Sequence, residues 1–270
     1  MHLKLKLWLL FIFFISICFF SFSYSTGQSE YQMDQGAIIR AHKTQKSLAL
    51  IFTGGDFADG GQHIKAVLKK KNIKAGFFFT GDFYRKPENY GLISQLIKDG
   101  HYLGPHSDKH LLYCSWENRD ELLVTKDEFV DDILNNYEAM KVFGLTKKGS
   151  PYFIPPYEWY NQAIADWSQE LGITLFNFTP GTASNADYTT PSMTSYKSSK
   201  EIFNSIKNYE KNSEWGLNGF ILLLHIGTHP ERTDKFYFYL EDLIDYIICK
   251  GYNFLKIDEL LSPGLNETNK

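Results

Sequence analysis

Short continuous runs of apolar residues alternate with runs of helical spacing from Ser47 to the end of the chain. A continuous apolar run of this length, bounded by turn residues, is typical of a strand buried on both faces. The runs predict strands at Leu48–Phe52, Ala75–Thr80, His101–Gly104, Tyr152–Ile154, Thr174–Phe178, Phe220–His225 and Asn253–Ile257.

The segments between these runs carry apolar residues at helical spacing. Phe129, Ile133, Tyr137 and Met140 recur at intervals of four, four and three, which indicates an amphipathic helix. Further helices are predicted within Ile64–Lys71, Leu92–Ile97, Ala163–Leu171, Ile202–Tyr209 and Phe236–Ile247. Buried strands that alternate with helices predict an α/β fold around a parallel sheet. The alternation has no linker, so we expect one domain of about seven βα units, as a closed barrel or an open sheet.

The first 27 residues differ from the rest of the chain. Lys4 and Lys6 precede an apolar run from Leu7 to Phe22, and small polar residues follow it. This order predicts a signal peptide, and a retained N-terminal membrane anchor is the alternative. We therefore expect an exported protein, periplasmic or extracellular, with no stable membrane span after cleavage. The predicted boundaries are a signal peptide at 1–27, a polar lead-in at 28–46, one domain at 47–262 and a tail at 263–270.

Composition narrows the possible partners. The net charge of −3 gives no basic footprint for nucleic acid. Aromatic residues make up 16% of the chain, which fits either a stacking surface for sugar rings or an aromatic core. Cys114 and Cys249 are the only cysteines after the predicted signal peptide, and two cysteines are no disulfide framework. Their pairing stays open, and Cys249 is expected as a small core residue.

Polar residues gather at the predicted carboxyl ends of the strands, where parallel βα folds place their functional sites. His106 and His110 lie four residues apart just after such an end. On a helical turn this spacing places both rings on one side, close enough to share a metal ion. Neutral imidazoles suit Zn, Ni, Co or Fe, and Asp56 is the natural third ligand from another strand end. The alternative is that the spacing is incidental.

Other strand ends and loops carry further candidates. His225 ends the most apolar strand, so it is either a satisfied core histidine or a proton carrier suited to acid–base chemistry near neutral pH. The stretch Trp116–Asp120 is either a substrate loop or a solvated connection. The long segment Thr179–Ser198 could wall a groove, and Asp187 within it could orient His225.

Taken together, five segments in order resemble the polysaccharide deacetylase (NodB-homology) family of carbohydrate esterases, over about Ser47 to Leu261. The segment His106-Ser107-Asp108-Lys109-His110 matches the family's His-(Ser/Thr)-x-x-His motif, and Leu223-Leu224-His225 matches its late Leu-Leu-His motif. The other three segments are Lys74–Gly81, which resembles the family's KATFFVTG strand, Gly100–Gly104, which resembles its GHEIG segment, and Lys256–Leu260, which resembles its closing strand.

The resemblance implies a single-domain distorted (β/α)7 barrel with a divalent metal, zinc before cobalt, nickel or iron. It implies His106 and His110 as metal ligands and His225 as the general acid. It also implies that the backbone N–H of Tyr157 helps to bind the oxyanion. The third motif of the family falls at Pro155-Pro156-Tyr157-Glu158, which we expect to contact the substrate.

This chain departs from the family in two motifs. Thr53 and Gly54 stand where the family has paired aspartates, and Ile154 stands where it has an arginine. Asp56 is the nearest carboxylate, and the Gly54-Gly55 turn could aim it toward the metal as ligand or base. Asp59 and Glu158 are further candidates for the base.

Three functions fit these residues. The first is a metal-dependent hydrolase that removes acetyl groups from an envelope or extracellular polysaccharide or oligosaccharide. In it, a carboxylate takes the proton of a metal-bound water and His225 protonates the leaving group. The second is a non-catalytic carbohydrate-binding protein on a deacetylase scaffold, favoured by the residues at Thr53, Gly54 and Ile154. A metal-dependent hydrolase with another substrate is a third possibility.

Overall fold

A parallel sheet forms the centre of the computed structural model, which describes residues 31–262. Its strands run in the order β5–β4–β3–β8, and β9 also pairs with β3. The bounds are β3 (Ser47–Gly54), β4 (Gly76–Phe79), β5 (Tyr102–Pro105), β8 (Phe220–His225) and β9 (Asn253–Phe254). Every residue of β3 is buried, as the continuous apolar run predicted. The register sets Thr53 beside His225 on one side and beside Phe78 on the other.

Shorter strands extend this sheet toward a ring. They are β1 (Gln32–Asp34), β2 (Ala37–Arg40), β6 (Tyr152–Phe153) and β7 (Thr174–Leu175). At one edge the backbone N–H of Tyr152 donates to Tyr102 Oη at 3.0 Å. At the other edge Ile38 forms a parallel bridge with Phe176, and the N–H of Thr179 donates to the carbonyl of Ile221 at 3.0 Å. The chain therefore has the α/β fold of the (β/α)7 type, with strand pairing interrupted among the described residues.

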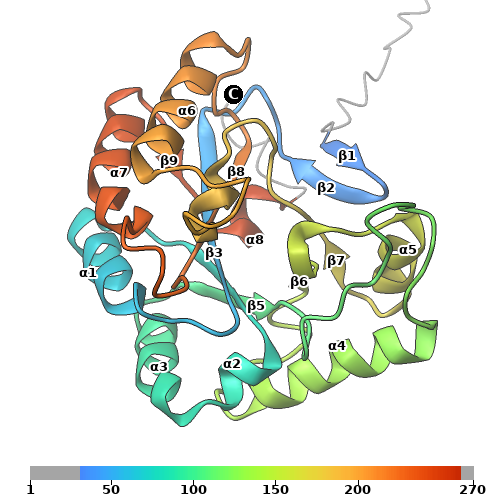
Figure 1. Cartoon of the computed structure of the whole chain (residues 1–270). Helices are drawn as coiled ribbons and strands as arrows, with labels where there is room; N and C mark the ends of the chain where they lie inside the picture. The colour runs from blue at the N-terminus through green and yellow to red at the C-terminus, as the bar shows by residue number, and fades with distance from the viewer. Residues whose placement is uncertain (1–30, 263–270) are drawn as a thin grey trace, which may run out of the picture.

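Helices surround the strands (Figure 1). The α-helices are α1 (Gly61–Lys71), α2 (Gly81–Arg85), α3 (Tyr90–Lys98), α4 (Lys126–Lys141), α5 (Gln162–Glu170), α6 (Ser199–Asn212), α7 (Leu240–Cys249) and α8 (Ile257–Leu260). The 3₁₀ helices are η1 (Pro87–Asn89), η2 (Pro156–Glu158), η3 (Ser184–Tyr188) and η4 (Phe236–Tyr239). Helix α4 begins with a capping box between Thr125 and Glu128. Its predicted apolar stripe is buried, which confirms that helix.

The polar segment at 28–46 is not a structureless lead-in where the structure describes it. Strands β1 and β2 form an antiparallel hairpin there, and all four residues of β2 are buried. Arg40 is 3% exposed, and its guanidinium donates to the carbonyls of Asn218 and Gly216 and to Tyr209 Oη. Sequence periodicity missed this hairpin because a buried arginine breaks the apolar run, although its hydrogen bonds satisfy it in the fold.

Two smaller expectations are also wrong. The last strand ends at Phe254, and Ile257 instead begins helix α8. Cys249 is exposed, because the buried stripe of α7 ends at Ile247 and Cys249 lies at the last turn of the helix. Cys114 is buried, and both thiols are free.

The predicted signal peptide and the tail at 263–270 lie outside the described residues. Among residues 31–262, no helix has the length and apolar character needed to cross a bilayer.

Replacement of Arg40 tests the role of the hairpin. We expect Arg40→Ala to lower the free energy of unfolding by about 2–4 kcal/mol, because two backbone carbonyls lose a charged donor. Urea denaturation monitored by circular dichroism measures this change. The exposed Lys148 gives a control, and Lys148→Ala should change stability by less than about 0.5 kcal/mol. Equal stability of both variants would show that the hairpin is not part of the cooperative core.

Candidate functional site

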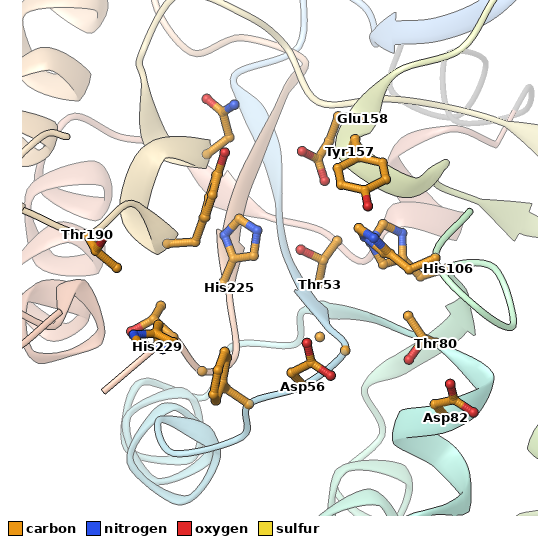
Figure 2. Close-up of a pocket in the computed structure, with 18 of the residues that line it drawn as sticks. Thr53, Asp56, Thr80, Asp82, His106, Tyr157, Glu158, Thr190, His225 and His229 are labelled. Atoms are coloured by element: carbon orange, nitrogen blue, oxygen red, sulfur yellow. The ribbon is translucent and has the colours of Figure 1, made fainter. Parts of the chain in front are cut away.

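One cavity of ≈ 930 Å³ opens at the carboxyl ends of β3, β4, β5 and β8. Its size falls within the range of small-molecule sites in enzymes. Figure 2 shows His225, Thr53 and His106 in a row across it, with Glu158 on one side and Asp56 on the other. The lining also includes His110, Asp82, Asp108, Trp116, Tyr157, Asn185, Tyr188 and Glu231.

The two histidines of the HxxxH motif meet, but on a loop and not on the helical turn that we expected. Ser107 and His110 have φ values of 71° and 55°, in the left-handed region that non-glycine residues rarely adopt. The ring centroids of His106 and His110 are 5.0 Å apart. Backbone strain of this kind persists where surrounding contacts fix the conformation, and it is common at functional sites.

Two side chains of helix α4 hold the loop that carries His106 and His110. The side-chain oxygen of Asn136 accepts from the backbone N–H of His106 at 2.9 Å. Asp132 Oδ1 accepts from the backbone N–H groups of Asp108 and Lys109 at 3.2 and 3.0 Å. Both side chains are buried.

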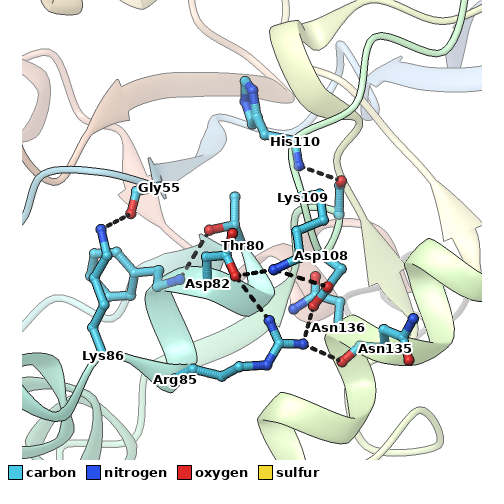
Figure 3. Close-up of polar contacts among 12 residues, drawn as sticks. Gly55, Thr80, Asp82, Arg85, Lys86, Asp108, Lys109, His110, Asn135 and Asn136 are labelled. Carbon is cyan, nitrogen blue, oxygen red and sulfur yellow. Dashed lines mark hydrogen bonds and ion pairs between the residues drawn. The ribbon is translucent and has the colours of Figure 1, made fainter.

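Side-chain ion pairs add to this support on the α2 side of the loop (Figure 3). Arg85 pairs with Asp108 and with Asp82, and Lys109 also pairs with Asp82. Within the loop, the backbone N–H of His110 donates to Ser107 Oγ at 2.8 Å. The loop is thus held by contacts from α2, from α4 and from its own residues.

Asp132 and Asn136 were not predicted as site residues. The sequence could have indicated their role, because these two polar residues lie four apart and interrupt the apolar face of the predicted helix. A polar side chain on a buried helix face needs a hydrogen-bond partner, and here the partner is the histidine loop.

The protonation state of both histidines suits metal ligands. His106 Nδ1 lies 2.9 Å from the carbonyl of Ile154, so Nδ1 carries the proton and Nε2 keeps its lone pair. Burial, together with the neighbouring His110, lowers the pKa of His106 well below its usual value. Burial and the charge of His225 lower the pKa of His110 to about 4. Both rings are therefore neutral at neutral pH, the form that binds divalent transition ions.

His225 faces the pocket with a carboxylate partner. Its Nδ1 is 2.6 Å from Asp187 Oδ1, and its backbone N–H donates to Asp187 Oδ2 at 2.9 Å. Burial lowers the pKa of His225, but the charge and hydrogen bond of Asp187, together with the charge of Glu158, outweigh burial and raise this pKa above its usual value. This pair fixes the ring and leaves Nε2 as the remaining nitrogen for proton transfer.

Asp56 does not join the two histidines in the structure. Its side chain is 88% exposed, and its carboxylate lies 3.9 Å from Lys86 Nζ. Residues 31–262 contain no group of three or more His, Cys, Asp or Glu side chains arranged to hold a metal ion. Thr53 is buried, and its Oγ1 has no hydrogen-bond partner among the described residues.

Asp59 and Glu158, the further candidates for the base, differ in their partners and in their position relative to the pocket. Asp59 pairs with Lys235 at 3.0 Å, accepts from Tyr237 Oη at 3.0 Å and from the N–H of Thr228 at 2.8 Å. Burial raises its pKa, but these donors outweigh burial and lower it. Asp59 is not among the residues that line the pocket, whereas Glu158 is.

The third motif, Pro155-Pro156-Tyr157-Glu158, has two buried prolines followed by two residues that line the pocket. Pro155 and Pro156 are buried beneath the pocket wall, so they shape the loop and do not line the cavity. Tyr157 is 46% exposed, and its ring centroid lies 4.4 Å from that of His110. Its φ of 58° turns the backbone at this point.

The stretch Trp116–Asp120 packs against this motif and is not a solvated connection throughout. Trp116 stacks on Trp159 with ring centroids 5.4 Å apart, and the Arg119 guanidinium carbon lies 4.7 Å from the centroid of the Trp159 ring. Trp116 is 57% exposed and lines the pocket. An exposed aromatic face beside a polar pocket is the kind of surface on which sugar rings stack.

The effect of the Asp187 charge on His225 can be tested by measuring the pKa of His225. We expect Asp187→Asn to lower the pKa of His225, because the variant removes the negative charge that stabilises the imidazolium. Chemical-shift titration of the histidine ring protons measures this change. Since folding raises this pKa, the protonated ring stabilises the fold at low pH and that contribution is lost as pH rises through the folded-state value. An unchanged pKa in the variant would contradict the assigned pairing.

Comparison with known proteins shows the family to which this chain is related. The polysaccharide deacetylase profile matches residues 40–176. The chain is 25% identical over 223 residues to a peptidoglycan N-acetylglucosamine deacetylase, PgdA, of Listeria monocytogenes, which covers 83% of this chain and 40% of that protein. It is 26% identical over 217 residues to a peptidoglycan N-acetylglucosamine deacetylase of Bacillus cereus, which covers 80% of this chain and 89% of that protein.

A solved structure agrees with the fold. BA3943 of Bacillus anthracis, described as a CE4 family pseudoenzyme, superposes with a TM-score of 0.65 at 17% identity, over 84% of this chain and 69% of that chain. The chain spans less than half of the length of the Listeria relative and most of the Bacillus cereus relative. With the profile match across half of its length, the chain belongs to the polysaccharide deacetylase family.

Proposed function

We propose that this protein is a hydrolase that removes acetyl groups from a polysaccharide of the cell envelope or the extracellular space. The observation that carries the proposal is the arrangement of two pairs in one pocket. The His225–Asp187 pair faces the neutral His106–His110 pair, with a cavity of ≈ 930 Å³ beside them. Acyl transfer to water needs a proton donor for the leaving group and a group that stabilises the oxyanion.

His106 and His110 fit a divalent transition metal, zinc before cobalt, nickel or iron. Both rings are neutral, and the Ile154 carbonyl orients His106 as carbonyls orient metal-bound histidines elsewhere. Asp56 is the third ligand that we propose, which requires its exposed carboxylate to turn inward about the Gly54-Gly55 segment. A bound ion would supply Lewis acidity toward an acetyl carbonyl and a water of lowered pKa.

The protein's own groups have separate roles in this proposal. Protonated His225 donates its Nε2 proton to the departing nitrogen or oxygen, while Asp187 holds the ring in position. The backbone N–H of Tyr157 donates to the oxyanion at the turn that its left-handed conformation creates. The exposed Trp116 and Tyr157 rings stack against the sugar.

Two similar proteins suggest where to look for the substrate. The Listeria and Bacillus cereus relatives are peptidoglycan N-acetylglucosamine deacetylases, so N-acetylglucosamine polymers are the first candidates for this chain. The predicted signal peptide agrees with a substrate outside the cytoplasm.

A non-catalytic carbohydrate-binding protein is the second candidate. It is favoured by Thr53, which stands at the first motif with no carboxylate, and by the exposed position of Asp56. In this case the pocket would bind a glycan through its aromatic rim and release no acetate.

Acetate release separates the two functions. Chitooligosaccharides, peptidoglycan fragments and acetylxylan are incubated with protein stripped of metal and reloaded with zinc or cobalt. We expect metal-dependent release, and His225→Ala should lower it by about 100- to 10,000-fold because the leaving group loses its proton donor. His229→Ala is the matched control, since this exposed histidine lies on the rim of the same pocket. Binding of these glycans without acetate release would support the second candidate.

Thr53, which lies between His225 and His106 in the pocket, gives a second test of the metal site. We expect Thr53→Asp to tighten zinc binding by at least about tenfold, or 1.4 kcal/mol, because it adds a buried carboxylate beside two neutral histidines. Isothermal titration calorimetry with zinc measures the affinity. The metal-free variant should be less stable than the wild type, because the added charge is buried and unpaired. Thr53→Val is the control and should leave the affinity within about threefold. Equal zinc affinities of all three proteins would place the metal elsewhere.

A further inference from the structure

Glu158 occupies an unusual backbone position on the pocket wall. Tyr157 and Glu158 are two successive non-glycine residues in the left-handed region, with φ values of 58° and 53°. The N–H of Glu158 donates to the carbonyl of Pro155 at 3.1 Å, and Asn177 Nδ2 donates to the carbonyl of Glu158 at 2.8 Å. Glycine would adopt this conformation without strain, so a glutamate here lowers stability. Strain of this kind persists only where the surrounding structure fixes the conformation, and it is common at functional sites.

The direction that Glu158 takes is toward the centre of the pocket. Figure 2 shows its carboxyl group beside the Tyr157 ring, facing the space that His225 and Thr53 border. Within residues 31–262 this carboxyl group has no hydrogen-bond or ion-pair partner. A partly buried carboxyl group without a partner is free to accept a proton from a bound molecule.

The other carboxylates of the pocket are either paired or exposed. Asp82 and Asp108 pair with Arg85, and Asp187, which does not line the pocket, is bonded to His225. Asp56 and Glu231 are exposed at the rim. Of the carboxylates that line this pocket, Glu158 thus combines partial burial with a free carboxyl group.

The surroundings of Glu158 also suit proton transfer at neutral pH. Burial raises its pKa to about 7, the effect of Asp187 is in the same direction, and the nearby His225 opposes both. A base works best when its pKa lies near the operating pH.

We propose that Glu158 is the general base of this site and replaces the carboxylate that the first motif lacks at Thr53. This inference rests on the proposed deacetylase function. Glu158 accepts one proton from the attacking water as the water oxygen bonds to the acetyl carbonyl carbon. The carbon–nitrogen or carbon–oxygen bond to the sugar then breaks, and His225 donates a proton to the leaving atom. Acetic acid and the free amine or hydroxyl are the products, and the acid ionises to acetate. Glu158 then releases its proton to solvent, and His225 takes one up.

Two variants of Glu158 separate a chemical role from a structural one. Glu158→Gln keeps the side-chain shape and removes the basic oxygen, so kcat should fall by at least about 100-fold with KM within about threefold. Glu158→Gly removes the carboxyl group and the backbone strain together. It should lose as much activity while its Tm rises by about 2–4 °C. Formate should restore part of its activity by supplying a carboxylate to the vacated space.

Glu231→Gln is the matched control, because Glu231 is exposed at the rim of the same pocket and has no assigned role. It should keep activity within about threefold of the wild type. The assay is acetate release from the chitooligosaccharide series, with Tm measured by calorimetry on the same samples.

Three different results would contradict the base assignment, and they differ in what they say about the deacetylase function. Acetate release by Glu158→Gln at the wild-type rate would overturn the base assignment and leave the deacetylase function intact. A Glu158→Gly variant with lower Tm, lower activity and no response to formate would make Glu158 a structural residue. Absence of acetate release by the wild type would overturn the deacetylase function and the base assignment with it.

Discussion

The parallel register of β3 with β8 and β4 is the constraint on which the rest of the site depends. It sets Thr53 beside His225, and it brings the loop after β5 to the same edge of the sheet. Because all residues of β3 are buried, a slip of this strand would expose or displace its apolar side chains, and the register is therefore strongly specified. The pocket forms because carboxyl ends of parallel strands share one edge, and its polar residues lie on the loops that leave that edge.

The two halves of the pocket are stabilised in different ways. The histidine loop is held by two buried side chains of α4, Asp132 and Asn136, so the conformation of the His106–His110 pair depends on the packing of this helix. The proposed proton donor, His225, is held by Asp187 of η3, which bonds both the ring and the backbone of His225. The third motif supplies backbone strain at Tyr157 and Glu158. In our proposal, the scaffold keeps two motifs of the family while Glu158 takes over the role of the missing carboxylate.

Much of the fold followed from sequence patterns because buried parallel strands and amphipathic helices have distinct periods. The hairpin at β1 and β2 could not be predicted, since the buried Arg40 is satisfied by carbonyls distant in the chain. The pairing of His106 with His110 was predicted, but its loop geometry was not, because left-handed residues such as Ser107 leave no mark in a hydrophobic pattern. That the Glu158 carboxyl group has no hydrogen-bond or ion-pair partner among the described residues could not be predicted, because the fold decides which carboxylates meet a partner.

Anomalous X-ray diffraction from crystals grown with zinc would locate a bound metal ion among the pocket residues. We expect one ion bound by His106 and His110, with Asp56 turned inward and Glu158 near the ion but not coordinated to it. An ion ligated by Glu158 would contradict its role as a free base. The absence of zinc from the histidine pair at saturating concentration would contradict the metal-dependent deacetylase itself.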